Sequence, residues 1–221
     1  GGGNAAPLLV ADFLVRRIGQ STPSAGADNT LSVTLRGRAS LFNGTVVSLS
    51  GLAASGTAST SALPLDLLGD SALHFAPQAG WDREAGNLTV QVLNGTLPNV
   101  SYAFSFTLRN PVAPQDSPPV RVSAGGAVRV AEATMDPGEG NEAPLLVAGA
   151  LISRLGQTDA SSAALNTLTL TLSFNAELPP GTVLSLSGLE GAVVDAAAPV
   201  PLLGNLSASI AAGGGGGGNR A

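Results

Sequence analysis

The chain contains an internal repeat, and the length of that repeat restricts the possible folds more than any other feature. Residues 4–11 (Asn-Ala-Ala-Pro-Leu-Leu-Val-Ala) recur at residues 141–148 (Asn-Glu-Ala-Pro-Leu-Leu-Val-Ala), an offset of 137 positions. At this offset, 28 of the 49 positions in residues 4–52 are identical to those in residues 141–189. Solenoid and propeller units repeat every ~20–50 residues, whereas this repeat has the size of a whole domain. The sequence therefore predicts domains in series.

The second copy is shorter than the first. After a two-residue deletion the match resumes at residues 202–205, and nothing in the second copy corresponds to residues 75–136. We expect three regions: a complete repeat over residues 1–137, the front half of a second repeat over residues 138–212, and a Gly-rich linker or tail over residues 213–221. Half a domain leaves an apolar face exposed. We therefore expect either that the chain is a fragment of a longer polypeptide or that another chain donates the missing strands.

Apolar and hydroxyl residues alternate along most of the first copy, which is typical of half-buried strands. Residues 31–35 (Leu-Ser-Val-Thr-Leu) place three apolar side chains on one face, and residues 168–172 (Leu-Thr-Leu-Thr-Leu) repeat the pattern. The other runs of this kind are residues 47–49, 88–92, 102–108, 120–122 and 128–130. About seven or eight short strands predict an all-β fold, an antiparallel two-sheet β-sandwich of immunoglobulin-like or fibronectin-like type, repeated in tandem. A jelly roll is the alternative.

The alternation also predicts which side chains form the core. Successive residues of a strand point to opposite faces of the sheet, so the apolar members of each run share a face. We expect one buried cluster that contains Leu31, Val33, Leu35, Leu49, Trp81, Val90, Val92, Phe104 and Phe106.

Residues that carry catalytic chemistry are sparse. The chain has no cysteine, one histidine (His74), 11% charged residues and a net charge of −5. His74 has no second histidine or cysteine to pair with, and there is no Gly-x-Ser-x-Gly motif or phosphate-binding loop. We expect a protein that is not an enzyme and holds no cofactor or metal. The acidic balance argues against a nucleic-acid partner, and the longest apolar run is too short for membrane insertion.

Acidic residues gather at the junction of the two copies, where Asp136, Glu139 and Glu142 offer oxygen ligands for Ca²⁺. Their spacing matches no calcium-binding loop, so a solvated linker is the preferred interpretation. Asp82 and Glu84 are interpreted as a polar turn rather than an acid–base pair.

Among the polar residues that recur between the copies are the pairs Arg17/Arg154 and Gln20/Gln157. Residues shared by two repeats of one chain usually encode the shared fold. The preferred interpretation is that the arginine stem covers an edge of the sandwich.

Glycosylation is the most specific modification signal. Asn-x-Ser/Thr occurs at Asn43, Asn87, Asn94, Asn99 and Asn205, where chance gives roughly two such sites. Turns also favour Asn-Gly-Thr, which accounts for part of the excess. Residues 110–119, which contain four prolines, predict either a rigid extended crossover or hydroxylation and O-glycosylation at Pro118 and Pro119.

Four segments together form a recognisable pattern of strands and turns. They are residues 18–23 (Ile-Gly-Gln-Ser-Thr-Pro), 27–35 (Ala-Asp-Asn-Thr-Leu-Ser-Val-Thr-Leu), 45–52 (Thr-Val-Val-Ser-Leu-Ser-Gly-Leu) and 102–111 (Tyr-Ala-Phe-Ser-Phe-Thr-Leu-Arg-Asn-Pro). The pattern resembles a repeat of very long extracellular proteins of unicellular algae, such as the axial proteins of flagellar hairs (mastigonemes). It spans the first copy and the front of the second. The resemblance implies an N-glycosylated extracellular protein at the cell or flagellar surface.

The function expected from these features is structural. We expect a building block of a long extracellular repeat protein that forms a filament, flagellar hair or cell-surface array. Its expected partners are neighbouring repeats or other filament subunits, with covalent glycans. The alternative is an adhesin or carbohydrate-binding surface module. Sugar sites usually present several exposed aromatic side chains. This alternative is less favoured because the chain contains only one Trp and one Tyr.

Overall fold

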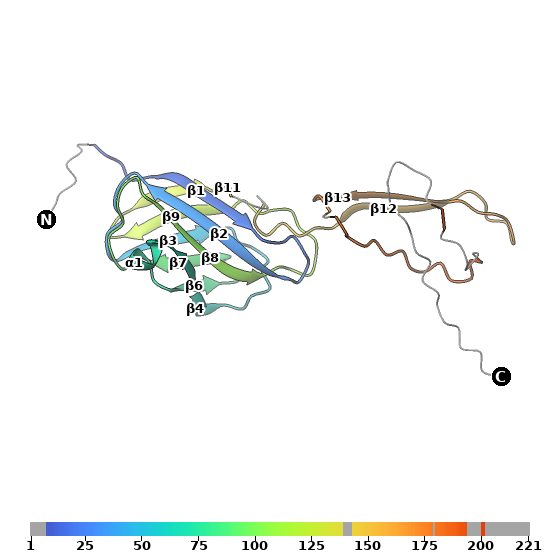
Figure 1. Cartoon of the computed structure of the whole chain (residues 1–221), viewed down its shortest axis with the longest axis horizontal. Coiled ribbons are helices and arrows are strands. Elements are labelled where there is room, and N and C mark those ends of the chain that lie inside the picture. Colours follow the sequence, from blue (N-terminus) through green and yellow to red (C-terminus); the bar gives the residue numbers. More distant parts are fainter. Residues whose placement is uncertain (1–7, 139–142, 179, 194–199, 202–221) are drawn as a thin grey trace, which may run out of the picture. The chain divides into compact units, whose positions relative to one another are not determined.

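The computed structural model describes residues 8–138, 143–178, 180–193 and 200–201 (Figure 1). The chain divides into two compact units, Gly1–Leu178 and Pro179–Ala221. All strands found in the described residues belong to the first unit, together with one short helix, α1 (Ser71–His74).

Two sheets make up the first copy. The five-stranded sheet has the order β11-β1-β2-β8-β5, and the six-stranded sheet has the order β10-β9-β3-β7-β6-β4. Neighbouring strands are antiparallel except β1 and β11, which are parallel. The bounds are β1 Phe13–Gln20, β2 Asp28–Gly37, β3 Thr45–Ser50, β4 Thr60–Pro64, β5 Asp66–Leu68, β6 Gln78–Asp82, β7 Asn87–Gln91, β8 Ser101–Arg109, β9 Arg121–Gly126, β10 Val130–Thr134 and β11 Asp136–Pro137.

The two sheets pack against each other around one hydrophobic core, so the predicted all-β sandwich is confirmed. Buried and more exposed residues alternate along β2, because its apolar residues face the opposite sheet and its hydroxyl residues face outward. All nine residues predicted for the core are buried. The alternation of polarity therefore predicted the correct face of each of these strands.

The strands agree with the predicted runs in most places. Residues 128–130 are the exception, because β10 begins only at Val130, where the predicted strand ends. Five strands of the first copy were not predicted at all: β1, β4, β5, β6 and β11. Apolar and polar residues do not alternate in β1, where three apolar residues precede Arg16 and Arg17. The other four strands have only two to five residues; β4 ends at Pro64, and β6 contains Gly80.

The described part of the second copy forms one hairpin, β12 (Ala150–Gln157) and β13 (Leu168–Phe174). Every residue pair in this hairpin is a β1–β2 pair shifted by 137 positions. Gln157↔Leu168, for example, corresponds to Gln20↔Leu31. The irregularity near the start of β1 recurs at the same relative place in β12. The sequence repeat is thus also a repeat of strand register.

Candidate functional site at the junction of the two copies

The sandwich of the first copy has two ends, named here by the course of β1. The leading end is where β1 begins, with Phe13 paired to Gly37. The trailing end is where β1 ends, with Gln20 paired to Leu31. In Figure 1 the described chain enters at the leading end, where α1 also lies.

A segment of the second copy is buried in the sandwich of the first. This docking segment, residues 143–148, precedes β12. Leu145 and Val147 have no exposed surface, and Leu145 belongs to the same core cluster as the side chains of the first sandwich. Leu145 has a φ of 57°, in the left-handed region that non-glycine residues rarely adopt. A bulky residue in this conformation indicates that tertiary packing fixes the turn.

Backbone hydrogen bonds hold the docking segment along the connection between β8 and β9. Gln115 and Val147 form an isolated antiparallel bridge, in which each backbone N donates to the other's carbonyl oxygen, at 3.2 and 2.9 Å. The backbone N of Ala148 donates to the carbonyl oxygen of Pro23 at 2.8 Å. The segment therefore satisfies its backbone groups as an added strand would.

Side chains of the β8–β9 connection also bind the docking segment. The Nε2 of Gln115 donates to the carbonyl oxygen of Leu145 at 2.8 Å. The Oγ of Ser117 donates to the carbonyl oxygen of Pro144 at 2.8 Å. Within residues 110–119, this connection bends at Val112 and Ala113 and forms an isolated bridge at Gln115.

Three buried side-chain amides link the docking segment to the sandwich. The Nε2 of Gln20 donates to the carbonyl oxygen of Leu146 at 3.1 Å. The Oε1 of Gln20 accepts a hydrogen bond from the Nδ2 of Asn29 at 2.9 Å, and this Nδ2 also donates to the Oδ1 of Asn110 at 2.8 Å. The exposed fractions of Gln20, Asn29 and Asn110 are 4%, 0% and 1%. We call these three residues the amide relay.

The relay also fixes the loop between β1 and β2. The Oδ1 of Asn29 accepts hydrogen bonds from the backbone N of Ser21 and Thr22 at 3.1 and 3.3 Å. The Nδ2 of Asn110 donates to the carbonyl oxygens of Thr22 and Ser24 at 3.0 and 2.9 Å. The relay thus joins β1, β2 and the end of β8 to the second copy.

The second copy repeats the first part of the relay. The Nδ2 of Asn166 donates to the Oε1 of Gln157 at 3.0 Å, and the Oδ1 of Asn166 accepts from the backbone N of Thr158 and Asp159. These are the bonds of Gln20 and Asn29 shifted by 137 positions. Gln20 and Gln157 were interpreted as part of the shared fold, whereas Asn29 and Asn110 were missed. The recurrence of Asn29 as Asn166 at the same offset was the signal that could have revealed the first of these two.

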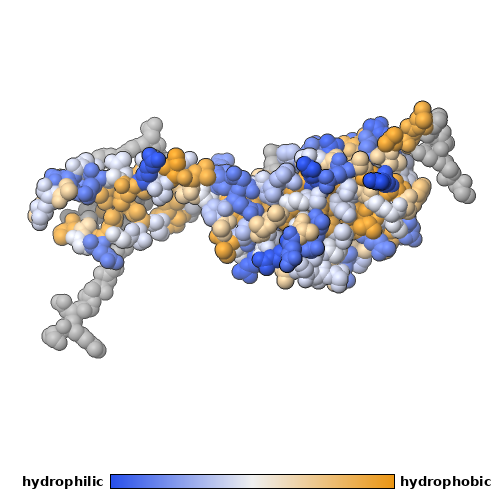
Figure 2. Space-filling model, turned by 180° about the vertical axis from the view of Figure 1, so that it is seen from behind, coloured by the Kyte–Doolittle hydropathy of each residue, from blue (hydrophilic) through white to orange (hydrophobic). Residues whose placement is uncertain are grey.

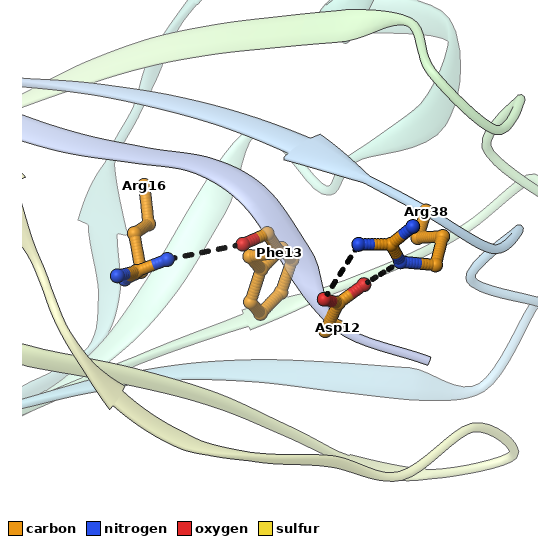
Figure 3. A network of polar contacts seen from close by, with 4 residues as sticks. All are labelled: Asp12, Phe13, Arg16 and Arg38. Atoms are coloured by element: carbon orange, nitrogen blue, oxygen red, sulfur yellow. Dashed lines mark hydrogen bonds and ion pairs between the residues drawn. The ribbon is translucent and has the colours of Figure 1, made fainter. Parts of the chain in front are cut away.

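Two positions at the base of the hairpin differ between the copies and alter the contacts made there. In the second copy, the Oδ1 of Asn175 accepts from the backbone N of Gly149, while its Nδ2 donates to the carbonyl oxygens of Val147 and Gln115. In the first copy, Asp12 and Arg38 occupy the positions of Gly149 and Asn175. Their side chains form an ion pair with an Nε–Oδ1 distance of 2.7 Å (Figure 3). This hydrogen bond, together with the charge of Asp12, raises the pKa of Arg38.

The other polar residues weighed from the sequence lie away from the junction or have structural roles. His74 is half-buried and contacts the ring of Tyr102 edge-on, with centroids 5.0 Å apart. Asp82 accepts backbone hydrogen bonds from residues 84 and 85, as expected of a polar turn. Within the described residues, no three His, Cys, Asp or Glu side chains gather in a way that could hold a metal ion.

The arginine predicted to cover a sheet edge is exposed on β1. The backbone of Arg17 lies opposite Asp136 of the edge strand β11. The side chain that binds this edge is that of the neighbouring Arg16, whose Nε donates to the carbonyl oxygen of Thr134 at 2.6 Å. Its Nη2 lies 3.9 Å from the Oδ1 of Asp136. Of the candidate calcium ligands, Asp136 therefore pairs with an arginine, and Glu139 and Glu142 lie outside the described residues.

The candidate glycosylation residues differ in accessibility. Asn43, Asn94 and Asn99 are exposed and Asn87 is half-buried, whereas Asn205 lies outside the described residues. Asn99 has a φ of 62°, and its backbone N donates to Gly37 at the leading end. The two candidate prolines are half-buried in a small cleft beside the docking segment. A glycan has more room at the three exposed asparagines than at Pro118 or Pro119.

No protein-family model matches the chain, and no match was found among curated proteins. In the part of the chain that the structure describes, no helix has the length and apolar character needed to cross a membrane.

Proposed function

We propose that this chain is a structural building block of a long extracellular repeat protein. In that protein, sandwich domains follow one another and form a filament or cell-surface array. The observation that carries the proposal is the recurrence of strand register and of the Gln–Asn hydrogen bonds at the 137-residue offset. A repeated register together with a repeated side-chain network indicates a repeated domain.

The junction supports a mechanical role for this repetition. A linker without contacts behaves as a flexible coil and lets neighbouring domains move independently. Here Pro144, Leu145 and Val147 of the docking segment are buried, and the backbone of this segment is hydrogen-bonded by Gln20, Gln115 and Ser117. Such a joint transmits force between consecutive domains through packing and backbone hydrogen bonds.

An extracellular location is proposed from the glycosylation sites. Only 11% of the residues are charged, which is low for a surface that must stay in solution. Glycans at the exposed residues Asn43, Asn94 and Asn99 would supply the missing polar surface. The proposed role is not catalytic, and the single histidine, His74, contacts the ring of Tyr102 edge-on.

The alternative, a carbohydrate-binding module, has one observation in its favour. The outer face of the six-stranded sheet carries an open hollow of about 390 Å³ with polar side chains, among them Gln78, Thr89 and Gln91. No aromatic side chain lines this hollow, whereas sugar sites usually include such side chains. The structural role is therefore preferred.

Immunoelectron microscopy on the native source tests the proposed function. Antibodies against this chain are expected to label a filament or an ordered layer outside the cell. Glycopeptide mass spectrometry of the same material is expected to find glycan on at least one of Asn43, Asn94 and Asn99. Label confined to the cell interior, with all three asparagines bare, contradicts the proposal.

A further inference from the structure

The first copy has its own counterpart of the docking segment. Residues 8–11, the leading segment, precede β1 as residues 145–148 precede β12, and the two have the same sequence, Leu-Leu-Val-Ala. Leu8 has a φ of 61°, close to the 57° of Leu145, so both segments make the same left-handed turn. The apolar side chains of the two segments differ in their exposure to solvent. Leu8 and Val10 are 99% and 77% exposed, whereas Leu145 and Val147 are fully buried.

We propose that the leading segment docks into the trailing end of a second copy of this sandwich, as the docking segment does within the chain. This inference rests on the proposed function and names the contact that joins one repeat to the previous one. The surface that receives the segment consists of the β8–β9 connection, the β1–β2 loop and Gln20. Figure 2 shows apolar surface exposed just after the N-terminal segment drawn in grey.

The chemistry of the two segments indicates that both can bind the same surface, the trailing end of a sandwich. The docking segment is held through its backbone and through the buried side chains of Leu145 and Val147, whose counterparts in the leading segment are Leu8 and Val10. The bonds from Gln20, Gln115 and Ser117 go to carbonyl oxygens of the segment, so they do not depend on its side chains. The segment also resembles a strand added to an edge, a mode in which main-chain bonds supply affinity and pockets supply specificity.

The ion pair of Asp12 and Arg38 adapts the leading segment to the same surface. In the second copy, Asn175 donates from its side chain to the carbonyl oxygen of Gln115. Arg38 occupies the same position and has five N–H donors. Its Nε and Nη2 bind Asp12, and its remaining donors are available for the equivalent carbonyl oxygen of another copy. A head-to-tail contact of this kind is heterologous, so it produces an open array unless the rotation between copies closes it into a ring.

Peptide binding to the full chain tests the proposal. In the variant Leu145→Asp/Val147→Asp, the internal docking segment is expelled and the trailing end becomes free. A fluorescent peptide of residues 4–12 is expected to bind this variant with a Kd within about tenfold of that for the peptide of residues 141–149. Neither peptide is expected to bind the wild-type chain, whose trailing end is filled. The residue 4–12 peptide carrying Leu8→Asp/Val10→Asp is the control and is expected not to bind.

Two results overturn the proposal. One is binding of the 141–149 peptide without binding of the 4–12 peptide. The other is absence of binding by both peptides while the emission of the buried Trp81 shows that the sandwich is folded. If the aspartate variant unfolds, Leu145→Ser/Val147→Ser replaces it with a smaller change in polarity. Because the assay uses purified protein, its failure leaves the microscopy test of the proposed function unaffected.

A second measurement uses self-association. The Leu145→Asp/Val147→Asp chain exposes both a free trailing end and a leading segment, so it is expected to form concentration-dependent oligomers in analytical ultracentrifugation. Adding Leu8→Asp/Val10→Asp is expected to restore the monomer. Oligomers that persist in the fourfold variant contradict the proposal, because they would arise from the apolar face of the second copy.

Discussion

At the scale of single residues, the amide relay shows how a polar group can stabilise a buried junction. A side-chain amide has two donors and an acceptor, so it can bridge several backbone groups at once. Asn29 uses its side chain to bind Gln20, Asn110 and two backbone N–H groups. Because the relay is buried, each bond that is lost leaves a polar group without water or partner.

Replacing Asn29 by alanine is therefore expected to destabilise the sandwich by about 2–4 kcal/mol, since several buried partners lose a hydrogen bond at once. Urea unfolding followed by the fluorescence of Trp81, the single tryptophan, measures the change. The matched control is Asn166→Ala, which removes the counterparts of all these bonds except the one to Asn110, at an exposed site of the second copy. Its expected cost is below about 0.5 kcal/mol. An equal loss of unfolding free energy in both variants would show that burial of the relay does not contribute to its stabilising effect.

Phe104 tests the core in the same way. Its side chain is 1% exposed and lies 6.1 Å from the ring of Phe75, measured between centroids. Phe104→Ala is expected to cost about 3–5 kcal/mol in urea unfolding, from lost burial and from the cavity that remains. Leu68→Ala in the neighbouring strand β5 removes a side chain that is 53% exposed, and about 1 kcal/mol or less is expected. A Phe104 cost as small as that of Leu68 would contradict the assigned core face.

At the scale of elements, the sequence could predict a strand where polar and apolar residues alternate and only one face of the strand is buried. This holds for β2, β3, β7 and β8. It fails for β1, because its last three residues, Ile18, Gly19 and Gln20, are all buried at the trailing end. A residue buried by a neighbouring segment shows no alternation, so periodicity cannot identify it.

The contacts at the junction could not be predicted from the sequence for a related reason. The recurrence of Pro-Leu-Leu-Val was the clearest signal in the chain, and it marked where the second copy starts. The docking position of this segment in the second copy depends on Gln115 and Pro23, which are distant in sequence and belong to connections rather than strands. Asn110 could not be identified because the second copy has no counterpart to it. A sequence repeat reveals the local structure that the two copies share, whereas the contacts between the copies can be identified only from the three-dimensional structure.

Strand β3 offers a test of a close backbone approach. Gly44 and Gly51 flank this strand, with φ values of 83° and 86°. A side chain at either position is strained by about 1–2 kcal/mol. A Cβ at Gly51 would in addition collide with the carbonyl oxygen of Pro119, whereas the space around Gly44 is open. Gly51→Ala is therefore expected to lower the urea midpoint more than Gly44→Ala does. An equal shift would contradict the tight contact between β3 and the β8–β9 connection.

At the scale of the whole molecule, the second copy exposes the positions that the first copy buries. Leu168 and Leu170 are 41% and 42% exposed, whereas their counterparts Leu31 and Val33 are 0% and 1% exposed. The cause is the absence, in the sequence of the second copy, of residues that match β6 to β10. An apolar face of this kind binds other apolar surface when it can. Figure 2 shows apolar residues at the surface of this part of the chain.

The central claim is that the second copy is the front of another sandwich of the same kind. The most direct test supplies the missing strands, in a chain where residues 53–137 are appended again after Leu189. Amide hydrogen exchange of β13 is then measured by mass spectrometry. The claim predicts that exchange in β13 slows by about 100-fold or more, to the level of β2, because β13 then lies inside a closed sandwich. Exchange in β13 that remains as fast as in the present chain, while β2 stays protected, would contradict the claim.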